Sequence, residues 1–288
     1  LNRETIYTCY VTEKRKLIGV VDIKDLLTTG EARLIEEIMD TNMLYARTTD
    51  DQEDVARTIT KYGLIALPIV DHEMCMVGIV TVDDAMLVLQ DEETEDISRM
   101  AGINPDDDSY FGMTIFEHVK SRIPWLLFLM LSATVTQMIM NSYESALAIM
   151  PQLAGFVPML TGTGGNCGSQ SSTLVIRGLA VGEIEFRDLL KVIWKEIRIA
   201  VCISIVLAVV NGLRIMLMGQ GDALMAFTIG LTMACTVVIA KVVGCTLPLI
   251  AKRVGLDPAI MATPLISTLV DISTISVYFA IVSAVFQL

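Results

Sequence analysis

A single carboxylate lies in the middle of the last apolar segment of the chain. Asp271 is the only charged residue between Asp257 and Leu288, and a carboxylate at membrane depth is unfavourable enough to indicate a functional site. Hydroxyl side chains recur around it at helical spacing, at Thr263, Ser267, Thr268 and Thr274. Hard oxygen donors of this kind favour Mg²⁺ over thiolate-binding metals. The alternative is a protonated Asp271 that is hydrogen-bonded inside a helix bundle.

The second candidate functional segment contains a glycine-rich run, residues 162–168. No charged residue occurs between Glu144 and Arg177, so the run belongs to a stretch long enough to cross a bilayer. Uncharged polar residues and one arginine share a helix face there: Asn166, Gln170, Thr173 and Arg177. This pattern predicts a pore lining or a seam between helices. The plainer interpretation, that the glycines only let helices pack closely, remains open.

Carboxylates are concentrated in a third stretch, the predicted helix that begins at Asp83 and continues through Asp96. Three of them, Asp84, Asp91 and Glu95, share one helix face. Like charges at this density repel one another, and bringing them near another acidic surface requires cations, for which Mg²⁺ and Ca²⁺ are suited. The alternative is an ordinary solvated acidic helix.

The candidate residues described above lie in two halves of the chain that differ in composition. Residues 1–123 contain 25 acidic and 12 basic side chains, whereas residues 124–288 contain 8 and 9. With 53% hydrophobic residues overall, an acidic soluble half precedes a nearly neutral apolar half. The acidic surface argues against a nucleic-acid partner. The six scattered cysteines are expected to be free thiols, because none forms a Cys-x-x-Cys pair.

The soluble half contains an internal repeat of 59 residues, since Leu17–Asp25 matches Met76–Asp84 and Gly19 matches Gly78. The second copy predicts a strand near 41–47, a helix over 52–62, strands over 66–70 and 76–81, and a helix from Val82. The order strand–helix–strand–strand–helix describes an α/β unit.

Five membrane spans are expected in the second half, at about 124–142, 152–175, 197–217, 223–250 and 259–286. Basic residues gather before the first span and in the loops 2–3 and 4–5: Lys120, Arg122, Arg187, Lys191, Lys195, Arg198, Lys252 and Arg253. The positive-inside rule places these loops and the soluble half in the cytoplasm and the C-terminus outside. Lys241, within the fourth span, is expected to snorkel or to face the bundle.

The soluble half resembles a tandem CBS module in the phrases Ile38–Asp40, Leu67–Asp71 and Gly78–Thr81. The resemblance implies a regulatory role and a site for ATP or another adenine nucleotide, with Thr81 and Asp84 in the place of the ribose-contact motif. A helix N-cap explains the same two residues without a nucleotide. The first CBS motif is expected to be truncated.

The membrane half resembles the MgtE family of magnesium channels and transporters, in the phrases Pro158–Gly182, Gly255–Ala259 and Thr263–Asp271. The expected fold is therefore multidomain: an α/β tandem CBS module (1–82), an acidic connecting helix and linker (83–123) and an all-α polytopic membrane domain of five transmembrane helices (124–288). The family's further cytosolic domain before the CBS pair is expected to be absent.

The MgtE resemblance also implies sites and partners. It implies a homodimer in the lipid bilayer with a Mg²⁺ pore at its axis, formed by Asp271, Gly164, Gly165, Asn166, Ser267, Thr268 and Thr263. It implies a second, cytosolic Mg²⁺ site that regulates the pore, formed by Asp51, Glu53, Asp84, Glu92, Glu95, Asp96 and Asp257.

The function expected on this basis is Mg²⁺ import across the plasma (inner) membrane, shut off when cytosolic Mg²⁺ binds the acidic CBS and linker region. One alternative is a secondary transporter of another divalent cation, Co²⁺ or Mn²⁺, or a cation–proton exchanger with Asp271 as proton relay. Another is a CBS-linked membrane sensor that transports nothing. An enzyme is not expected, because the sequence shows no nucleophile–base set, metal triad or phosphate loop.

Overall fold

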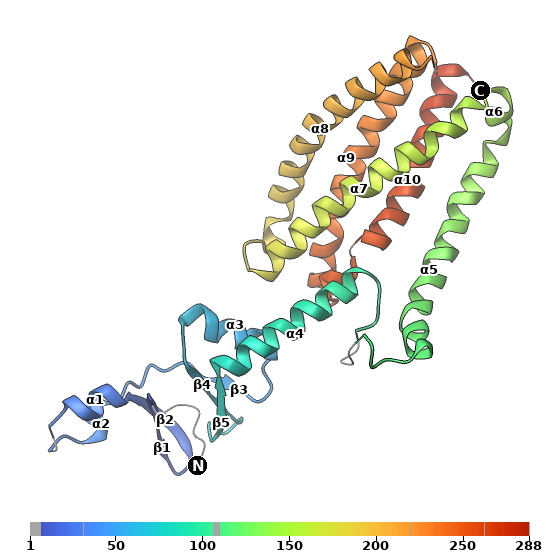
Figure 1. The fold of residues 1–288 in the computed structure, drawn as a ribbon. Helices are drawn as coiled ribbons and strands as arrows, with labels where there is room; N and C mark the ends of the chain where they lie inside the picture. The colour runs from blue at the N-terminus through green and yellow to red at the C-terminus, as the bar shows by residue number, and fades with distance from the viewer. Residues whose placement is uncertain (1–6, 31, 106–109, 220, 262, 288) are drawn as a thin grey trace. The chain divides into compact units, whose positions relative to one another are not determined.

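The computed structural model describes residues 7–30, 32–105, 110–219, 221–261 and 263–287. The chain forms two compact units, Leu1–Glu95 and Asp96–Leu288. Helix α4 (Val82–Met100) begins in the first unit and ends in the second. Figure 1 shows the order of the elements along the chain.

The first unit contains a hairpin and a three-stranded sheet. Strands β1 (Thr8–Glu13) and β2 (Lys16–Asp22) pair antiparallel and lead to the short helices α1 (Ile23–Thr28) and α2 (Ile35–Ile38). In the sheet, β4 (Ala66–Val70) lies between β3 (Ala46–Arg47), which is parallel to it, and β5 (Met76–Thr81), which is antiparallel. Helix α3 (Gln52–Tyr62) connects β3 to β4. The strand–helix–strand–strand–helix order predicted for the second copy is confirmed.

Local chemistry explains where these elements begin and turn. Asp51 caps α3 by accepting a hydrogen bond from the backbone N–H of Glu53 at 2.9 Å. In the turn between β4 and β5, the carboxylate of Asp71 accepts hydrogen bonds from the backbone N–H groups of Glu73 (2.9 Å) and Cys75 (2.8 Å). These bonds, that from Cys75 foremost, hold the pKa of Asp71 below its ordinary value.

Two backbone hydrogen bonds link the hairpin to the β4–β5 turn and the start of β5, although the hairpin and the three-stranded sheet are separate sheets. The Leu17 N–H donates to the Met74 carbonyl, and the Met76 N–H donates to the Arg15 carbonyl, both at 2.9 Å. The two repeat glycines have different surroundings here. A Cβ on Gly19 would lie 2.7 Å from Met39 Sδ, whereas one on Gly78 would meet nothing within 4 Å.

The second unit is helical. Its long helices are α5 (Ile115–Ser142), α7 (Gln152–Ala180), α8 (Leu189–Leu217), α9 (Ala223–Arg253) and α10 (Thr263–Phe286). Short segments join them: α6 (Glu144–Ile149), η1 (Phe186–Asp188) and η2 (Pro258–Met261). Helix α9 packs against α7, α8 and α10, and Figure 1 shows these four helices running side by side.

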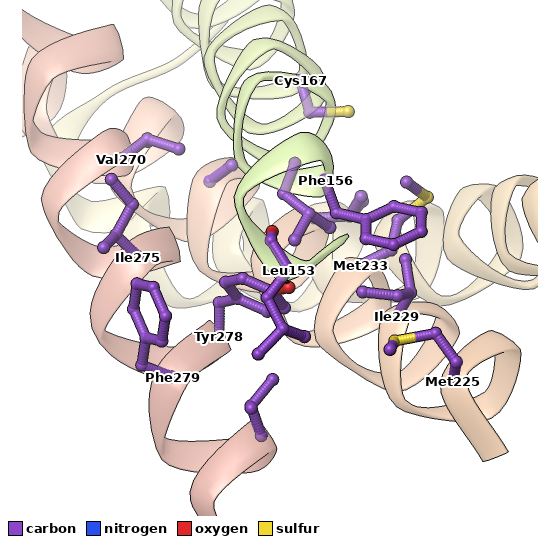
Figure 2. Packing of buried hydrophobic residues seen from close by; sticks show 14 of the residues in the cluster. Leu153, Phe156, Cys167, Met225, Ile229, Met233, Val270, Ile275, Tyr278 and Phe279 are labelled. Atoms are coloured by element: carbon purple, nitrogen blue, oxygen red, sulfur yellow. Dashed lines mark hydrogen bonds between the residues drawn. The ribbon is translucent and has the colours of Figure 1, made fainter. Parts of the chain in front are cut away.

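The apolar core of the bundle forms where α7, α9 and α10 meet. Figure 2 shows Leu153 and Phe156 of α7 facing Ile229 and Met233 of α9, with Tyr278 of α10 beneath. The Tyr278 hydroxyl donates to the Leu153 carbonyl at 3.0 Å, which satisfies this polar group inside the core. No residue of α5 is buried, although Tyr143, just after it, stacks on Phe279.

Four helical segments of the described residues are long and apolar enough to cross a membrane: Ile115–Ser142, Phe186–Leu217, Ala223–Arg253 and Pro258–Phe286. Helix α7 contains the remaining expected span and is 29 residues long, but its many Gly, Ser and Thr residues make it less apolar than these four. An α/β module with a helical membrane-type unit is thus confirmed. The number of five spans remains a prediction, as do the domain boundaries.

Candidate cation pathway

Three glycines of α7 form a flat, buried strip against two other helices. A Cβ on Gly164 would lie 2.7 Å from both Thr236 Cγ2 and Val270 Cγ1, and one on Gly168 would lie 2.7 Å from Ile266 Cγ2. Side chains of α9 and α10 therefore occupy the space that larger residues on α7 would need. The glycine face is a helix–helix seam, as the plainer interpretation of the run proposes.

The closest approach in this seam is between α7 and α9. A Cβ on Gly244 would lie 2.2 Å from the carbonyl oxygen of Gly168. Only glycine on α9 allows this separation, because the obstacle is backbone and cannot rotate away.

The polar face of α7 points away from that seam. Exposed side chains occupy all four of its positions, Asn166, Gln170, Thr173 and Arg177. The same helix thus has a packed glycine side and an unpartnered polar side. Within a bilayer, polar side chains normally face protein or water rather than lipid, so the second side requires a partner or an aqueous path.

The polar lane of α10 is split between buried and accessible positions. Asp271, Ser267 and Thr268 are half-buried, Thr263 is exposed, and Thr274 is buried against Gly164. Thr268 donates to the carbonyl of Pro264 on its own helix at 3.0 Å. Asp271 forms neither a hydrogen bond nor an ion pair with any of the described residues, so its carboxylate is available to an ion.

Only some of the expected pore residues come together in one chain. Gly165 lies against Ser267, because a Cβ on Gly165 would be 3.1 Å from Ser267 Oγ. Asn166 is exposed on the other side of α7. No group of three or more His, Cys, Asp or Glu side chains able to hold a metal occurs in the described parts of the chain.

A buried charged cluster, Ser171–Glu196–Lys241, joins α7, α8 and α9. The Lys241 ammonium donates to Ser171 Oγ at 3.0 Å and to Glu196 Oε2 at 3.3 Å, and Ser171 Oγ donates to Glu196 Oε2 at 2.5 Å. The side chains of Lys241 and Glu196 are 4% and 9% exposed. Lys241 thus faces the bundle. Sequence reasoning missed Glu196, although a lone lysine in an apolar run signals that an acid must be near.

Ser172, which follows Ser171 in the sequence, contacts the segment just before α10. Ser172 Oγ donates to the carbonyl of Met261 in η2 at 3.0 Å. Met261 lies two residues before α10 begins at Thr263, so the hydrogen bond fixes the end of α10 that precedes the lane.

The acids expected to form the regulatory site have local partners in the first unit. Asp51 caps α3, Glu53 pairs with Arg57, and Glu92 accepts a hydrogen bond from Gln52 Nε2 at 2.8 Å. The Asp84 carboxylate accepts a hydrogen bond from Thr81 Oγ1 at 2.8 Å. Glu95 lies farther along α4. Asp51, Glu53, Asp84 and Glu92 thus each have a partner within the first unit.

The last two expected regulatory acids, Asp96 and Asp257, belong to the second unit. Asp257 accepts a hydrogen bond from the Ala259 N–H at 2.8 Å and pairs with Arg99 Nη1 at 2.5 Å. Arg99 therefore supplies a positive charge to the carboxylate that the resemblance assigns to Mg²⁺.

A cavity of about 400 Å³ opens in the first unit between the β1–β2 hairpin and the loop before β4. Its lining includes Tyr10, Asp22, Asp40 and Asn42, and burial raises the pKa of the Tyr10 hydroxyl. Thr81 and Asp84 do not line it. Their mutual hydrogen bonds, with the Asp84 N–H donating to Thr81 Oγ1 at 3.4 Å, are those of a helix N-cap.

The fold and these features define a membrane protein with a CBS-type α/β module. Residues 157–281 match the model of the MgtE family, described as divalent cation transporters, and residues 35–91 match the CBS domain. The chain therefore contains an MgtE-family domain, over residues 157–281, and a CBS domain.

Curated relatives are similar in sequence to this chain over most of its length. It is 38% identical over 283 residues to the magnesium transporter MgtE of Thermus thermophilus, covering 96% of this chain and 62% of the relative. It is 34% identical over 284 residues to that of Enterococcus faecalis, covering 97% and 61%. The chain spans about three fifths of the length of these relatives. They are named as transporters, which agrees with the expectation that the chain is not an enzyme.

Two solved structures resemble about a third of the chain. One is the soluble part of a magnesium transporter, 41% identical, with a TM-score of 0.30, covering 31% of this chain and 35% of that one. The other is the cytosolic domain of the Mg²⁺ channel MgtE in complex with ATP, 46% identical, with a TM-score of 0.29, covering 30% and 35%.

Proposed function

We propose that this chain transports Mg²⁺ across the plasma membrane and that Asp271 is the carboxylate that attracts the ion. The observation that carries this proposal is the state of Asp271. It is half-buried within α10 and has no hydrogen-bond or ion-pair partner among the described residues. An unpaired carboxylate at such a depth gains most from a passing cation.

The neighbours of Asp271 suit a hydrated ion. Mg²⁺ releases its water shell reluctantly and is bound through a few oxygen ligands with several waters retained. Ser267 and Thr268 share the half-buried side of α10, and Gly165 leaves room beside Ser267. Hydroxyl and carbonyl groups at these positions accept hydrogen bonds from the water shell while Asp271 supplies the charge.

A homodimer provides the surroundings that a single chain lacks. Asn166, Gln170 and Thr173 form an exposed polar face on α7, and Thr263 is exposed at the start of α10. Two copies meeting along these faces remove the polar groups from lipid and line an aqueous path between them. In this proposal Asn166 lines the path. It lies on the side of α7 that is opposite to the glycine seam.

Cytosolic Mg²⁺ closes the path in this proposal, through the acids of the CBS unit and linker. The cation bridges carboxylates that otherwise repel, and it shifts the equilibrium only by its higher affinity for the closed state. The positive-inside pattern of the basic loops supports a cytoplasmic position for the CBS unit and an outside position for the C-terminus in this proposal. The 400 Å³ cavity beside Tyr10 and Asp40 is our candidate site for ATP or another adenine nucleotide.

Flux into liposomes tests the pathway, with internal Mg²⁺ varied on the side of the soluble unit. Asp271→Asn keeps the size of the side chain and removes the charge, so uptake should fall by tenfold or more. Asp222→Asn is the matched control, because Asp222 caps α9 by accepting from the Met225 N–H and asparagine caps equally well. Equal uptake by Asp271→Asn and the parent would refute the pore assignment.

One alternative rests on the same unpaired carboxylate, since Asp271 could carry a proton instead of attracting Mg²⁺. A cation–proton exchanger, or a carrier for Co²⁺ or Mn²⁺, predicts uptake that needs a proton gradient or prefers those ions. Uptake of Mg²⁺ without a proton gradient favours the channel.

A further inference from the structure

The Ser171–Glu196–Lys241 cluster has no part in the cation pathway described above, although it is the most deeply buried set of charges in the described residues. Its three side chains come from α7, α8 and α9. A charged pair inside a membrane-spanning bundle is unfavourable unless each charge is matched. Replacing such a pair by apolar residues is often neutral for stability, so tight packing alone does not account for it.

Helix α7 needs such a link because its main contact face is smooth. Gly164, Gly165 and Gly168 provide close approach, but they have no side chains that interlock with the neighbouring helices. A strip of this kind resists separation better than it resists sliding or rotation. The hydrogen bonds from Ser171 to Glu196 and Lys241 have directions, and they therefore fix the axial and rotational position of α7.

Ser172, which is adjacent to Ser171, links the position of α7 to that of α10. Ser172 holds the Met261 carbonyl at 3.0 Å, immediately before α10 begins. Nearer the start of α7, Gly165 lies against Ser267, which is one helical turn before Asp271. A shift of α7 would therefore move both the start of α10 and the surroundings of its carboxylate.

We propose that the Ser171–Glu196–Lys241 cluster is a positioning site that sets the register of α7 against α10 and thereby the ability of the pathway to distinguish Mg²⁺ from larger or softer divalent cations. Lys241 acts as a tethered cation that keeps Glu196 and Ser171 in contact with each other and with itself. Ser172 transmits that position to α10. This proposal rests on the proposed function, since discrimination is a property of the Asp271 pathway.

The experiment uses the full chain in liposomes and compares a paired variant with a matched control. Lys241→Met with Glu196→Met removes both charges and keeps apolar side chains of similar length. Lys195→Met with Glu183→Gln makes the same change in charge at two exposed positions. Thermal unfolding, the Mg²⁺ concentration for half-maximal uptake and the ratio of Mg²⁺ to Co²⁺ uptake are measured for each.

The paired variant should unfold within a few degrees of the parent, whereas its half-maximal Mg²⁺ concentration should rise and its Mg²⁺ to Co²⁺ ratio should fall, each by roughly tenfold, because small misplacements of a site have large effects. The control should match the parent in all three. Parental half-maximal concentration and ratio in the paired variant would overturn the proposal.

Ser172→Ala provides a second test that does not disturb the charges. It removes only the hydroxyl that holds Met261, so the protein should fold normally and shift both uptake measures in the same direction as the paired variant. Unchanged uptake measures in Ser172→Ala would contradict the role of α10.

Hydrogen exchange separates this proposal from the proposed function. If the parent takes up no Mg²⁺, the proposed function fails, and exchange in the peptide 258–268 decides the positioning role. Faster exchange there in both the paired variant and Ser172→Ala supports the proposal, and parental exchange in either variant overturns it.

Discussion

Gly244→Ala should separate α7 from α9, because the added methyl group has no room. Its carbon would lie 2.2 Å from the Gly168 carbonyl oxygen and 3.0 Å from the Gly168 carbonyl carbon. Ordinary contact begins near 3.4 Å, so the two backbones must move apart locally by about 1 Å. Both neighbours of the methyl group are backbone, and no side-chain rotation relieves the clash.

The expected destabilisation is about 1–3 kcal/mol, the usual range for overpacking. It is reduced by up to about 1 kcal/mol, since alanine is the better helix former. At about 2–4 °C per kcal/mol for a unit of this size, a net loss of about 1–2 kcal/mol corresponds to a fall of about 2–8 °C in the melting temperature. Loss of the close seam should also reduce Mg²⁺ uptake, since α7 contacts α10 through the same glycine face.

Gly212→Ala on α8 is the matched control, because a Cβ there meets nothing within 4 Å. It should leave the melting temperature unchanged or raise it slightly, through helix propensity alone. The assay is thermal unfolding in detergent, followed by fluorescence-detected size exclusion, with liposome uptake alongside. If Gly244→Ala is as stable as Gly212→Ala, the close approach of α7 and α9 is wrong.

Two further predictions concern charged groups outside the bundle core. Arg99→Gln removes the partner of Asp257 and should let cytosolic Mg²⁺ inhibit uptake at a several-fold lower concentration, which a titration of internal Mg²⁺ in liposomes measures; an unchanged inhibition curve would show that Arg99 does not compete with the ion. Asp71→Ala should loosen the β4–β5 turn fully above pH 3.8, and progressively less as the pH falls further. Because backbone hydrogen bonds hold the pKa of Asp71 below its ordinary 3.8, its stabilising contribution is complete above that pH and is lost as the pH falls through the lowered pKa. Acid titration of the full chain by circular dichroism should show the difference between the parent and Asp71→Ala constant above pH 3.8 and shrinking as the pH falls below it, and a difference that does not shrink would refute the assignment.

Elements that depend on the chemistry of neighbouring residues could be predicted from the sequence. Alternating β-branched residues bounded by turn formers located β4 and β5, and the turn at Asp71 followed from its side chain. The apolar runs located α5, α8, α9 and α10 because they are long and have few charges. The MgtE and CBS assignments followed from phrases that these elements carry, and the family comparisons confirm them.

The sequence could not show which side of a helix packs against which neighbour. The spacing of Asn166, Gln170 and Thr173 placed them on one face, but only the packing of Gly164 and Gly168 shows that this face is the exposed one. Glu196 stands among basic residues at the edge of an expected loop, so its burial against Lys241 depends on a contact 45 residues away. The roles of the site residues stay predictions.

The composition of α7 has a consequence for how the protein enters the membrane. Helices α5, α8, α9 and α10 are apolar enough to partition into a bilayer one by one, whereas α7 gains less from lipid because glycine, serine and threonine fill it. Its stability comes from the later helices that cover its glycine face. As the remaining predicted span, α7 is therefore expected to become stable in the membrane only once α9 and α10 have been synthesised. Truncation of the nascent chain after α8 should leave α7 the one helix that slips back out of the membrane.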